Sequence, residues 1–130
     1  MPDVQLDTVP SGRALVYVFN ASGATLIKNN YQVKADGRRI ADLPRSTYSV
    51  VAMMPGSHKL ESAGRKVELT LTEGQRAFVV VAYRPEKSPF PLGGSPIVFK
   101  TVSDGRARVM ISQFARRGGP DADVQTASPR

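Results

Sequence analysis

The sequence predicts an antiparallel β-sandwich of about seven or eight short strands, with a short C-terminal helix packed on it. Three observations lead to this fold class. Turn-forming residues recur every ~8–12 positions, as they do in all-β domains. Residues 66–72 alternate between outward polar and inward apolar side chains. The stretches 13–20 and 75–84 are apolar on both faces, which is typical of central strands in a sheet that is covered on both sides.

The first half of the chain is expected to form a lead-in and four strands. Residues 1–12 have no hydrophobic periodicity, so we expect a flexible lead-in or tether before a domain at 13–117. Asp36-Gly37 favours a hairpin, because both residues can adopt positive φ. Pro44 cannot donate to a strand ladder, so the strand before it should be short or at an edge. The expected strands are 13–20, 26–36, 38–43 and 47–53.

The second half is expected to continue the sandwich after a Pro55-Gly56 turn. There the proline fixes φ and the glycine supplies positive φ. The stretch 85–96 holds four prolines and two glycines, and it is longer than most connections. We expect this loop and the turns at 36–39 and 55–57 to be contact elements. The expected strands are 58–62, 66–72, 75–84 and 97–102.

Residues 104–117 are expected to form the helix. Ala107, Met110, Ile111 and Phe114 follow the i, i+3, i+4, i+7 spacing of an amphipathic helix. Ser103 or Asp104 could cap its start, and Gly118-Gly119-Pro120 would end it. A strand at VMISQF is the alternative, although its alternation is poor. Residues 118–130 lack a core-forming pattern and are expected to be a disordered tail.

Composition limits the possible chemistry. The 130 residues fit one domain, and the absence of cysteine excludes a disulfide framework, thiolate metal sites and a cysteine nucleophile. The net charge of +7 would attract anionic surfaces. The basic residues are scattered, however, and this favours a solvated surface over one binding patch. No apolar stretch approaches the ~20 residues of a membrane span.

No arrangement of residues points to catalysis, a cofactor or a metal. His58 is the single histidine, and its place after the Pro55-Gly56 turn favours a half-buried structural role over a general base or zinc ligand. Gly93-Gly94-Ser95 lacks the frame of a phosphate-binding loop and is interpreted as a flexible loop. The acidic residues at turns and on outward strand positions are interpreted as surface solvation. They are Asp36, Asp42, Glu61, Glu68, Glu73 and Asp104.

Two sets of basic residues are candidates for contact with an anion. Arg38, Arg39 and Arg45 gather near the expected hairpin loops. Tyr31 should face inward with Val33, so these arginines lack the exposed aromatic partner that single-stranded nucleic acid binding would require. The second set consists of Arg106, Arg108, Arg116 and Arg117. Phosphate or lipid headgroups are possible ligands of either set, with a solvated surface as the alternative.

Four motifs in order carry a resemblance to a known family. They are A-L-V-Y-V-F at 14–19, Y-x-V-x-x-D-G at 31–37, Y-x-V-V at 48–51 and P-G-x-H-x-L at 55–60. Over residues 13–115 the chain resembles the bacterial domain-of-unknown-function family two-eight-four-six. The resemblance implies a β-sandwich with a C-terminal segment that is often helical. It also implies a small exported protein, often a lipoprotein, with no established enzyme activity and no catalytic residues to carry over.

Taken together, these features favour a non-enzymatic structural or protein-interaction module of the cell envelope. Its partner would be another envelope protein. If an export segment precedes the domain, the protein would be periplasmic or membrane-anchored, with residues 2–12 as the tether; otherwise it would be cytoplasmic. The alternative function is binding of an anionic ligand such as lipopolysaccharide, acidic glycan or nucleic acid, of which nucleic acid is disfavoured. An enzyme that uses His58 with a nearby carboxylate or serine is the third hypothesis. The oligomeric state is left open.

Overall fold

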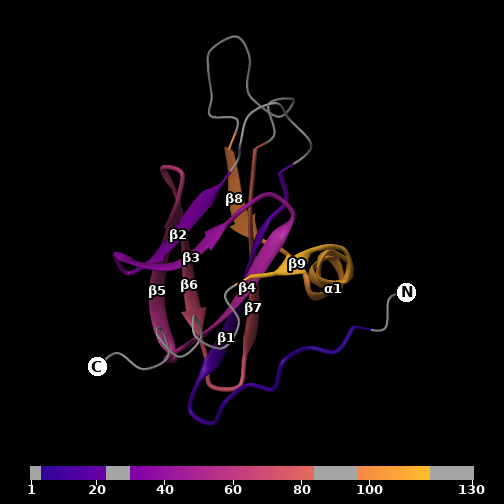
Figure 1. Ribbon diagram of the computed structural model, residues 1–130. Coiled ribbons are helices and arrows are strands. Elements are labelled where there is room, and N and C mark those ends of the chain that lie inside the picture. Colours follow the sequence, from indigo (N-terminus) through magenta and orange to yellow (C-terminus); the bar gives the residue numbers. More distant parts are fainter. Residues whose placement is uncertain (1–3, 23–29, 84–96, 118–130) are drawn as a thin grey trace.

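The computed structural model describes residues 4–22, 30–83 and 97–117. These residues form a sandwich of two β-sheets, with one short helix on the outer side of the larger sheet (Figure 1). The loop expected at 85–96, with Gly93-Gly94-Ser95, and the tail expected at 118–130 lie outside the described residues. The strands are β1 (Ala14–Asn20), β2 (Tyr31–Ala35), β3 (Arg38–Leu43), β4 (Thr47–Met53), β5 (Gly56–Ser62), β6 (Arg65–Leu71), β7 (Arg76–Tyr83), β8 (Ile97–Thr101) and β9 (Ala115–Arg116), and the helix is α1 (Asp104–Gln113).

The two sheets have the strand orders β8-β7-β1-β4-β9 and β3-β2-β5-β6. This architecture confirms the predicted β-sandwich with a short C-terminal helix. Purely antiparallel pairing is wrong at two places, because β1 pairs in parallel with β7 and β4 in parallel with β9. The chain crosses to the smaller sheet for β5 and β6, so β7 returns beside β1 without a hairpin to reverse its direction. The two-residue β9 adds a ninth strand to the eight that were expected.

Strand β1 is the centre of the larger sheet, and both of its faces are buried. Ala14, Val16 and Val18 face the core between the sheets, while Leu15, Tyr17 and Phe19 face the core under α1. The expectation that strands apolar on both faces mark a helix-covered sheet is therefore confirmed. The core under α1 also contains Tyr48, Val50, Ala52, Phe78, Val80, Ala107 and Met110.

The helix begins where it was expected and ends earlier. Ser103 is the N-cap, and its hydroxyl accepts a hydrogen bond from the N–H of Arg106 at 3.2 Å. The helix ends at Gln113, four residues before the expected end at 117, because Phe114 turns extended and leads into β9. Backbone bonds from Ala115 to Ser46 and from Arg117 to Tyr48 hold β9 on β4. Strand pairing thus replaces the last helical turn.

The turn and edge predictions for β2 and β3 are confirmed. Asp36 and Gly37 have φ of 52° and 85°, as a two-residue hairpin requires. Strand β3 ends before Pro44 and lies at the edge of the smaller sheet. Its register with β2 shifts between Val33 and Lys34, so this edge also carries a β-bulge. Strand β2 begins at Tyr31; residues 26–29 of the expected strand are not among the described ones.

Candidate functional site

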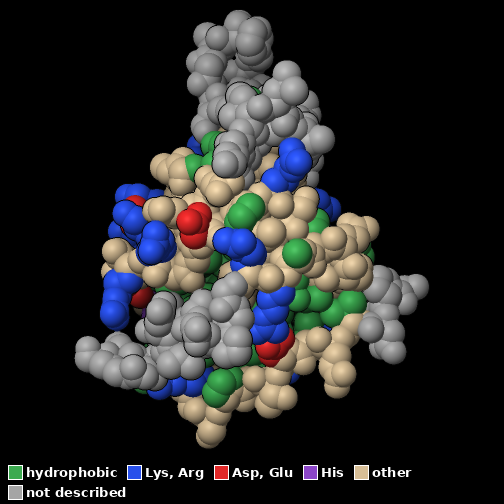
Figure 2. All heavy atoms as spheres, in the orientation of Figure 1, with side chains coloured by type: hydrophobic (Ala, Val, Ile, Leu, Met, Phe, Trp, Pro, Cys, Tyr) green, Lys and Arg blue, Asp and Glu red, His purple; other side chains and the backbone are tan. Residues whose placement is uncertain are grey.

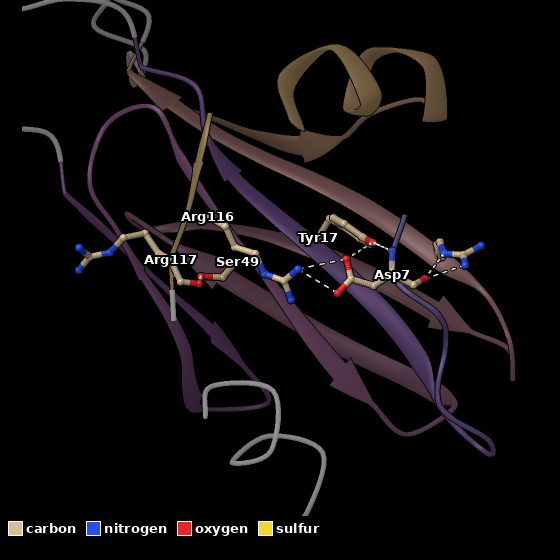
Figure 3. A network of polar contacts seen from close by, with 6 residues as sticks. Asp7, Tyr17, Ser49, Arg116 and Arg117 are labelled. Carbon is tan, nitrogen blue, oxygen red and sulfur yellow. Dashed lines mark hydrogen bonds and ion pairs between the residues drawn. The ribbon is translucent and has the colours of Figure 1, made fainter. Parts of the chain in front are cut away.

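The N-terminal segment lies against the larger sheet through Asp7 (Figure 3). The carboxylate of Asp7 pairs with Arg116 at 2.9 Å, and its backbone carbonyl accepts two bonds from Arg76 at 3.0 and 2.7 Å. Leu6 and Val9 pack on the core under α1. The described residues 4–12, which were expected to be a flexible lead-in, are therefore held to the domain by polar and apolar contacts.

Tyr17 is the buried anchor of this segment. Its hydroxyl accepts a hydrogen bond from the N–H of Asp7 at 2.7 Å and donates one to the Asp7 carboxylate at 3.1 Å. The side chain is 1% exposed, and this burial raises the pKa of Tyr17 to about 12. The phenol therefore stabilises the fold as long as it keeps its proton.

Stability is expected to fall between pH 10 and pH 12 because of Tyr17. The raised pKa contributes stability below the unfolded value near 10, and this contribution is lost as pH rises through the folded value of about 12. We expect a loss of about 2 kcal/mol across this window. Urea unfolding at pH 9 and pH 11.5 would measure it. Tyr17→Phe should show a smaller loss over the same interval, and an equal loss in both proteins would contradict the assignment.

His58 connects two turns of the smaller sheet. Its Nδ1 lies 2.6 Å from the Oδ2 of Asp36, and its Nε2 lies 2.7 Å from the backbone oxygen of Met54. Asp36 also accepts a bond from the N–H of Lys59 at 2.9 Å through its other carboxylate oxygen. The Y-x-V-x-x-D-G and P-G-x-H-x-L motifs therefore meet in space through Asp36 and His58.

The hydrogen bonds of His58 leave neither ring nitrogen facing solvent or a ligand. Both partner atoms are acceptors, so both contacts are hydrogen bonds only when both ring nitrogens carry a proton. The backbone N–H of Lys59, and then His58, hold the pKa of Asp36 below its usual range. This geometry supports the structural interpretation of the histidine, whose side chain is 14% exposed.

The first set of candidate arginines does not gather into one surface. Arg38 and Arg39 lie at the start of β3, and Arg45 lies beyond its other end. At about 3.3 Å per residue, the strand separates them by roughly 20 Å. All three are exposed, and Figure 2 shows Lys and Arg side chains spread over the visible face with acidic residues among them.

The second set of candidate arginines has divided roles. Arg108 pairs with Asp104 at 2.6 Å and donates to the carbonyl of Val4 at 3.0 Å, and Asp104 raises the pKa of Arg108. Arg116 pairs with Asp7, as described above. Arg117 bonds through its backbone to Tyr48 and Ser49. Arg106 lines a groove of two cavities beside α1.

This groove, which we name the α1 groove, consists of two adjoining cavities of about 680 and 570 Å³ that share Ala21 and Arg106. Apolar residues of the larger sheet form the floor of the first cavity, and the second runs along α1. None of the described residues that line them is acidic. They are Ala21, Val80, Ala82, Val98, Lys100, Thr101, Val102, Ser103 and Arg106 in the first, and Ala21, Ser22, Ser46, Gly105, Arg106, Val109, Met110, Gln113 and Phe114 in the second.

Strand β6 presents the longest regular edge of the smaller sheet. The N–H of Asp36 donates to the carbonyl of Lys59 at 2.8 Å, so the backbone of Lys59 faces β2. Because backbone groups alternate in direction along a strand, His58 and Leu60 face β6. In the register of β5 with β6, His58 lies opposite Leu69 and Leu60 opposite Val67, so the backbone groups of Leu69 and Val67 face β5. The N–H and C=O groups of the alternate β6 residues point away from β5, and no described strand pairs with these groups. These residues are Lys66, Glu68 and Thr70.

Sequence reasoning missed the α1 groove and the role of Asp7. A signal for the groove was present, because Val98 and Lys100 alternate onto one face of β8 and Arg106 lies one helical turn after the expected N-cap. Asp7 belongs to a segment without periodicity, so nothing in the sequence indicated its partners. Among the described residues, no group of three or more His, Asp or Glu could hold a metal ion, and no helix has the length and apolar character needed to cross a membrane.

Comparisons of the chain with protein-family models, with curated proteins and with solved structures gave no significant match. The resemblance to domain-of-unknown-function family two-eight-four-six therefore stays a prediction from the four motifs. The functional argument depends on the geometry of the β6 edge and the α1 groove.

Proposed function

We propose that this domain is a non-enzymatic interaction module that binds an extended segment of another protein at the β6 edge. The observation that supports the proposal is the direction of the backbone groups of Lys66, Glu68 and Thr70, which face away from β5. Such a row of donors and acceptors is what an added strand pairs with. The added segment would extend the smaller sheet from four strands to five.

The β6 edge suits strand addition better than the edge at β3. Strand β6 pairs with β5 without a register shift over seven residues, whereas β3 carries a bulge and ends before Pro44. The charges on β6 lie opposite charges of the other sign, with Lys66 across from Glu61 and Glu68 across from Lys59. These cross-strand pairs offset positive with negative charge on the exposed face next to the edge.

The cell envelope is the proposed location, and another envelope protein is the proposed partner. Both proposals rest on the four-motif resemblance, whose implied family consists of small exported proteins. Residues 4–12 are fixed to the larger sheet by the contacts of Asp7 with Arg76 and Arg116. Leu6 of the same segment lines a cavity with Leu69 of β6.

Thr70→Pro is expected to abolish partner binding at the β6 edge. Proline removes the outward N–H of residue 70 and leaves the ladder with β5 intact, because edge positions whose N–H faces solvent tolerate proline. Thr70→Val is the matched control, since it keeps the N–H. Both variants should remain folded by circular dichroism. The measurement is photocrosslinking in an envelope extract with a crosslinking residue at position 68, and then with one at position 42 on the far edge as a site control.

The proposal predicts one identifiable crosslinked protein at position 68, retained in Thr70→Val and lost in Thr70→Pro. The same crosslink from position 42, or its survival in Thr70→Pro, would contradict it. A concentration-dependent dimer that Thr70→Pro abolishes would show that the edge pairs with a second copy of this chain, which also contradicts a partner protein.

Binding of an anionic ligand is the second candidate function, and the α1 groove favours it. The net charge of +7 attracts anions to the whole surface, but the groove combines two cationic side chains with described lining residues that include no carboxylate. On the other sheet, the length of β3 separates Arg38 and Arg39 from Arg45, and the cavity lined by Lys34 and Lys66 also contains Glu61.

A further inference from the structure

The α1 groove has the features of a ligand site in which cations lie beside an apolar floor. Val80 and Ala82 are buried and line the bottom of the first cavity, with Val98 beside them. Each cavity falls within the ~300–1,000 Å³ that small-molecule sites occupy. The apolar part of a ligand would be removed from water by contact with these residues.

Lys100 and Arg106 supply the positive charge of the groove. Both side chains are exposed, and neither makes a side-chain hydrogen bond or ion pair with another described residue. Their donors are therefore available to a ligand. A guanidinium can bind a carboxylate through two parallel hydrogen bonds, while an ammonium acts as a point charge beside it.

The acidic residue nearest in sequence to this site is held on the other flank of the helix. Asp104 is bonded to Arg108, and both line a separate cavity with Leu6 and Arg76. At 100° per residue, positions 104 and 108 lie opposite position 106 on α1. Asp104 is therefore paired with Arg108 on the side of the helix that faces away from Arg106.

The second cavity extends the apolar surface beyond Arg106. Val109, Met110 and Phe114 line it, and Val109 is 38% exposed, one of two large apolar side chains exposed among the described residues. Ala21 joins the two cavities, and its small side chain leaves the passage open. The groove thus combines a cationic point with an elongated apolar track.

We propose that the α1 groove binds a single-chain anionic amphiphile of the fatty-acid class. The carboxylate lies between Lys100 and Arg106, and the alkyl chain runs over Ala21 toward Val109 and Phe114. This proposal is independent of strand addition at β6, because the groove lies on the other sheet. Charge complementarity selects the anionic head, and the apolar lining selects the chain over a free anion.

Isothermal titration with decanoate below its micelle concentration tests the proposal on the full chain. Acetate carries the head without the chain, and decanol carries the chain without the charge. We expect decanoate to bind at least tenfold more tightly than either. Lys100→Gln and Arg106→Gln should each weaken binding about tenfold, which is the effect expected when a charge-assisted hydrogen bond is removed.

Arg39→Gln is the matched control, because it removes the same charge from an exposed site on the other sheet. Equal binding of acetate, equal binding of decanol, or an equal loss in Arg39→Gln would each overturn the proposal. Ala21→Phe should block the passage and weaken decanoate while leaving acetate unchanged. Because this variant alone could disturb the fold, the glutamine variants decide the result if circular dichroism shows that Ala21→Phe is misfolded.

Discussion

Phe19→Ala is expected to lower the free energy of unfolding by about 4 kcal/mol, the largest effect of any substitution considered for this chain. Phe19 is fully buried in the core under α1. Its ring lies 5.4 Å from that of Tyr48 and 6.2 Å from that of Phe114, measured between centroids. The substitution would leave a cavity where β1, β4 and the end of α1 meet, and a rigid sheet can close such a cavity only in part.

Urea unfolding followed by circular dichroism would measure this change. Val109→Ala is the control on the same part of the structure, because Val109 is 38% exposed and should change stability by at most about 0.5 kcal/mol. A loss below about 1 kcal/mol in Phe19→Ala would mean that the helix does not form a second core on the outer face of the larger sheet.

Asn20→Ala is expected to cost about 2 to 3 kcal/mol, although asparagine is a polar residue of modest size. Asn20 is fully buried at the end of β1. Its side-chain amide donates to the carbonyl of Leu43 at 2.9 Å, and its side-chain oxygen accepts from the N–H of Ser22 at 3.1 Å and from the Ser22 hydroxyl at 2.7 Å. Alanine would leave these buried groups without their partner.

The matched control for this prediction is Asn30→Ala, because Asn30 is exposed and should change stability by at most about 0.5 kcal/mol. Thermal or urea unfolding of the two variants gives the comparison. If Asn20→Ala were as mild as Asn30→Ala, the link from β1 to the end of β3 would carry no net stability. The Asn20-Ala21-Ser22 stretch would then be an ordinary loop.

The strands were predictable because the burial of each strand face determines which positions in the sequence are apolar. The alternation in 66–72 identified β6, and the apolar character of 13–20 and 75–84 on both faces identified two central strands under a helix. The parallel pairing of β1 with β7 was not predictable in the same way. The direction of pairing depends on the crossing of β5 and β6 to the other sheet. The residue pattern of a central strand is the same whether its neighbour runs parallel or antiparallel.

The end of α1 shows a similar limit. The apolar spacing through Phe114 fits a helix, and Phe114 does pack on the core under α1. Backbone hydrogen bonds from residues 115–117 to β4 then compete with a further helical turn, and they prevail. Tertiary pairing of this kind has no signature in local spacing, so the predicted helix ran past its true end.

The role of a candidate residue could be predicted only where it depended on the residue's own turn or strand. The turn position of His58 indicated a structural role, and its bonds to Asp36 and Met54 support that interpretation. The grouping of Arg38 with Arg45 failed because proximity in sequence is not proximity in space when a strand intervenes. The pairing of Lys100 with Arg106 depends on the meeting of β8 with α1, which sequence spacing alone does not give.

Hydrogen exchange of the β6 amides tests the central claim most directly. It would be measured on the domain alone and after addition of the protein captured by crosslinking at position 68. Strand addition predicts slower exchange of the amides of Lys66, Glu68 and Thr70, which face outward, with little change at Val67 and Leu69, which already pair with β5. Unchanged exchange at Lys66, Glu68 and Thr70 in the bound state, with new protection elsewhere, would contradict binding at this edge.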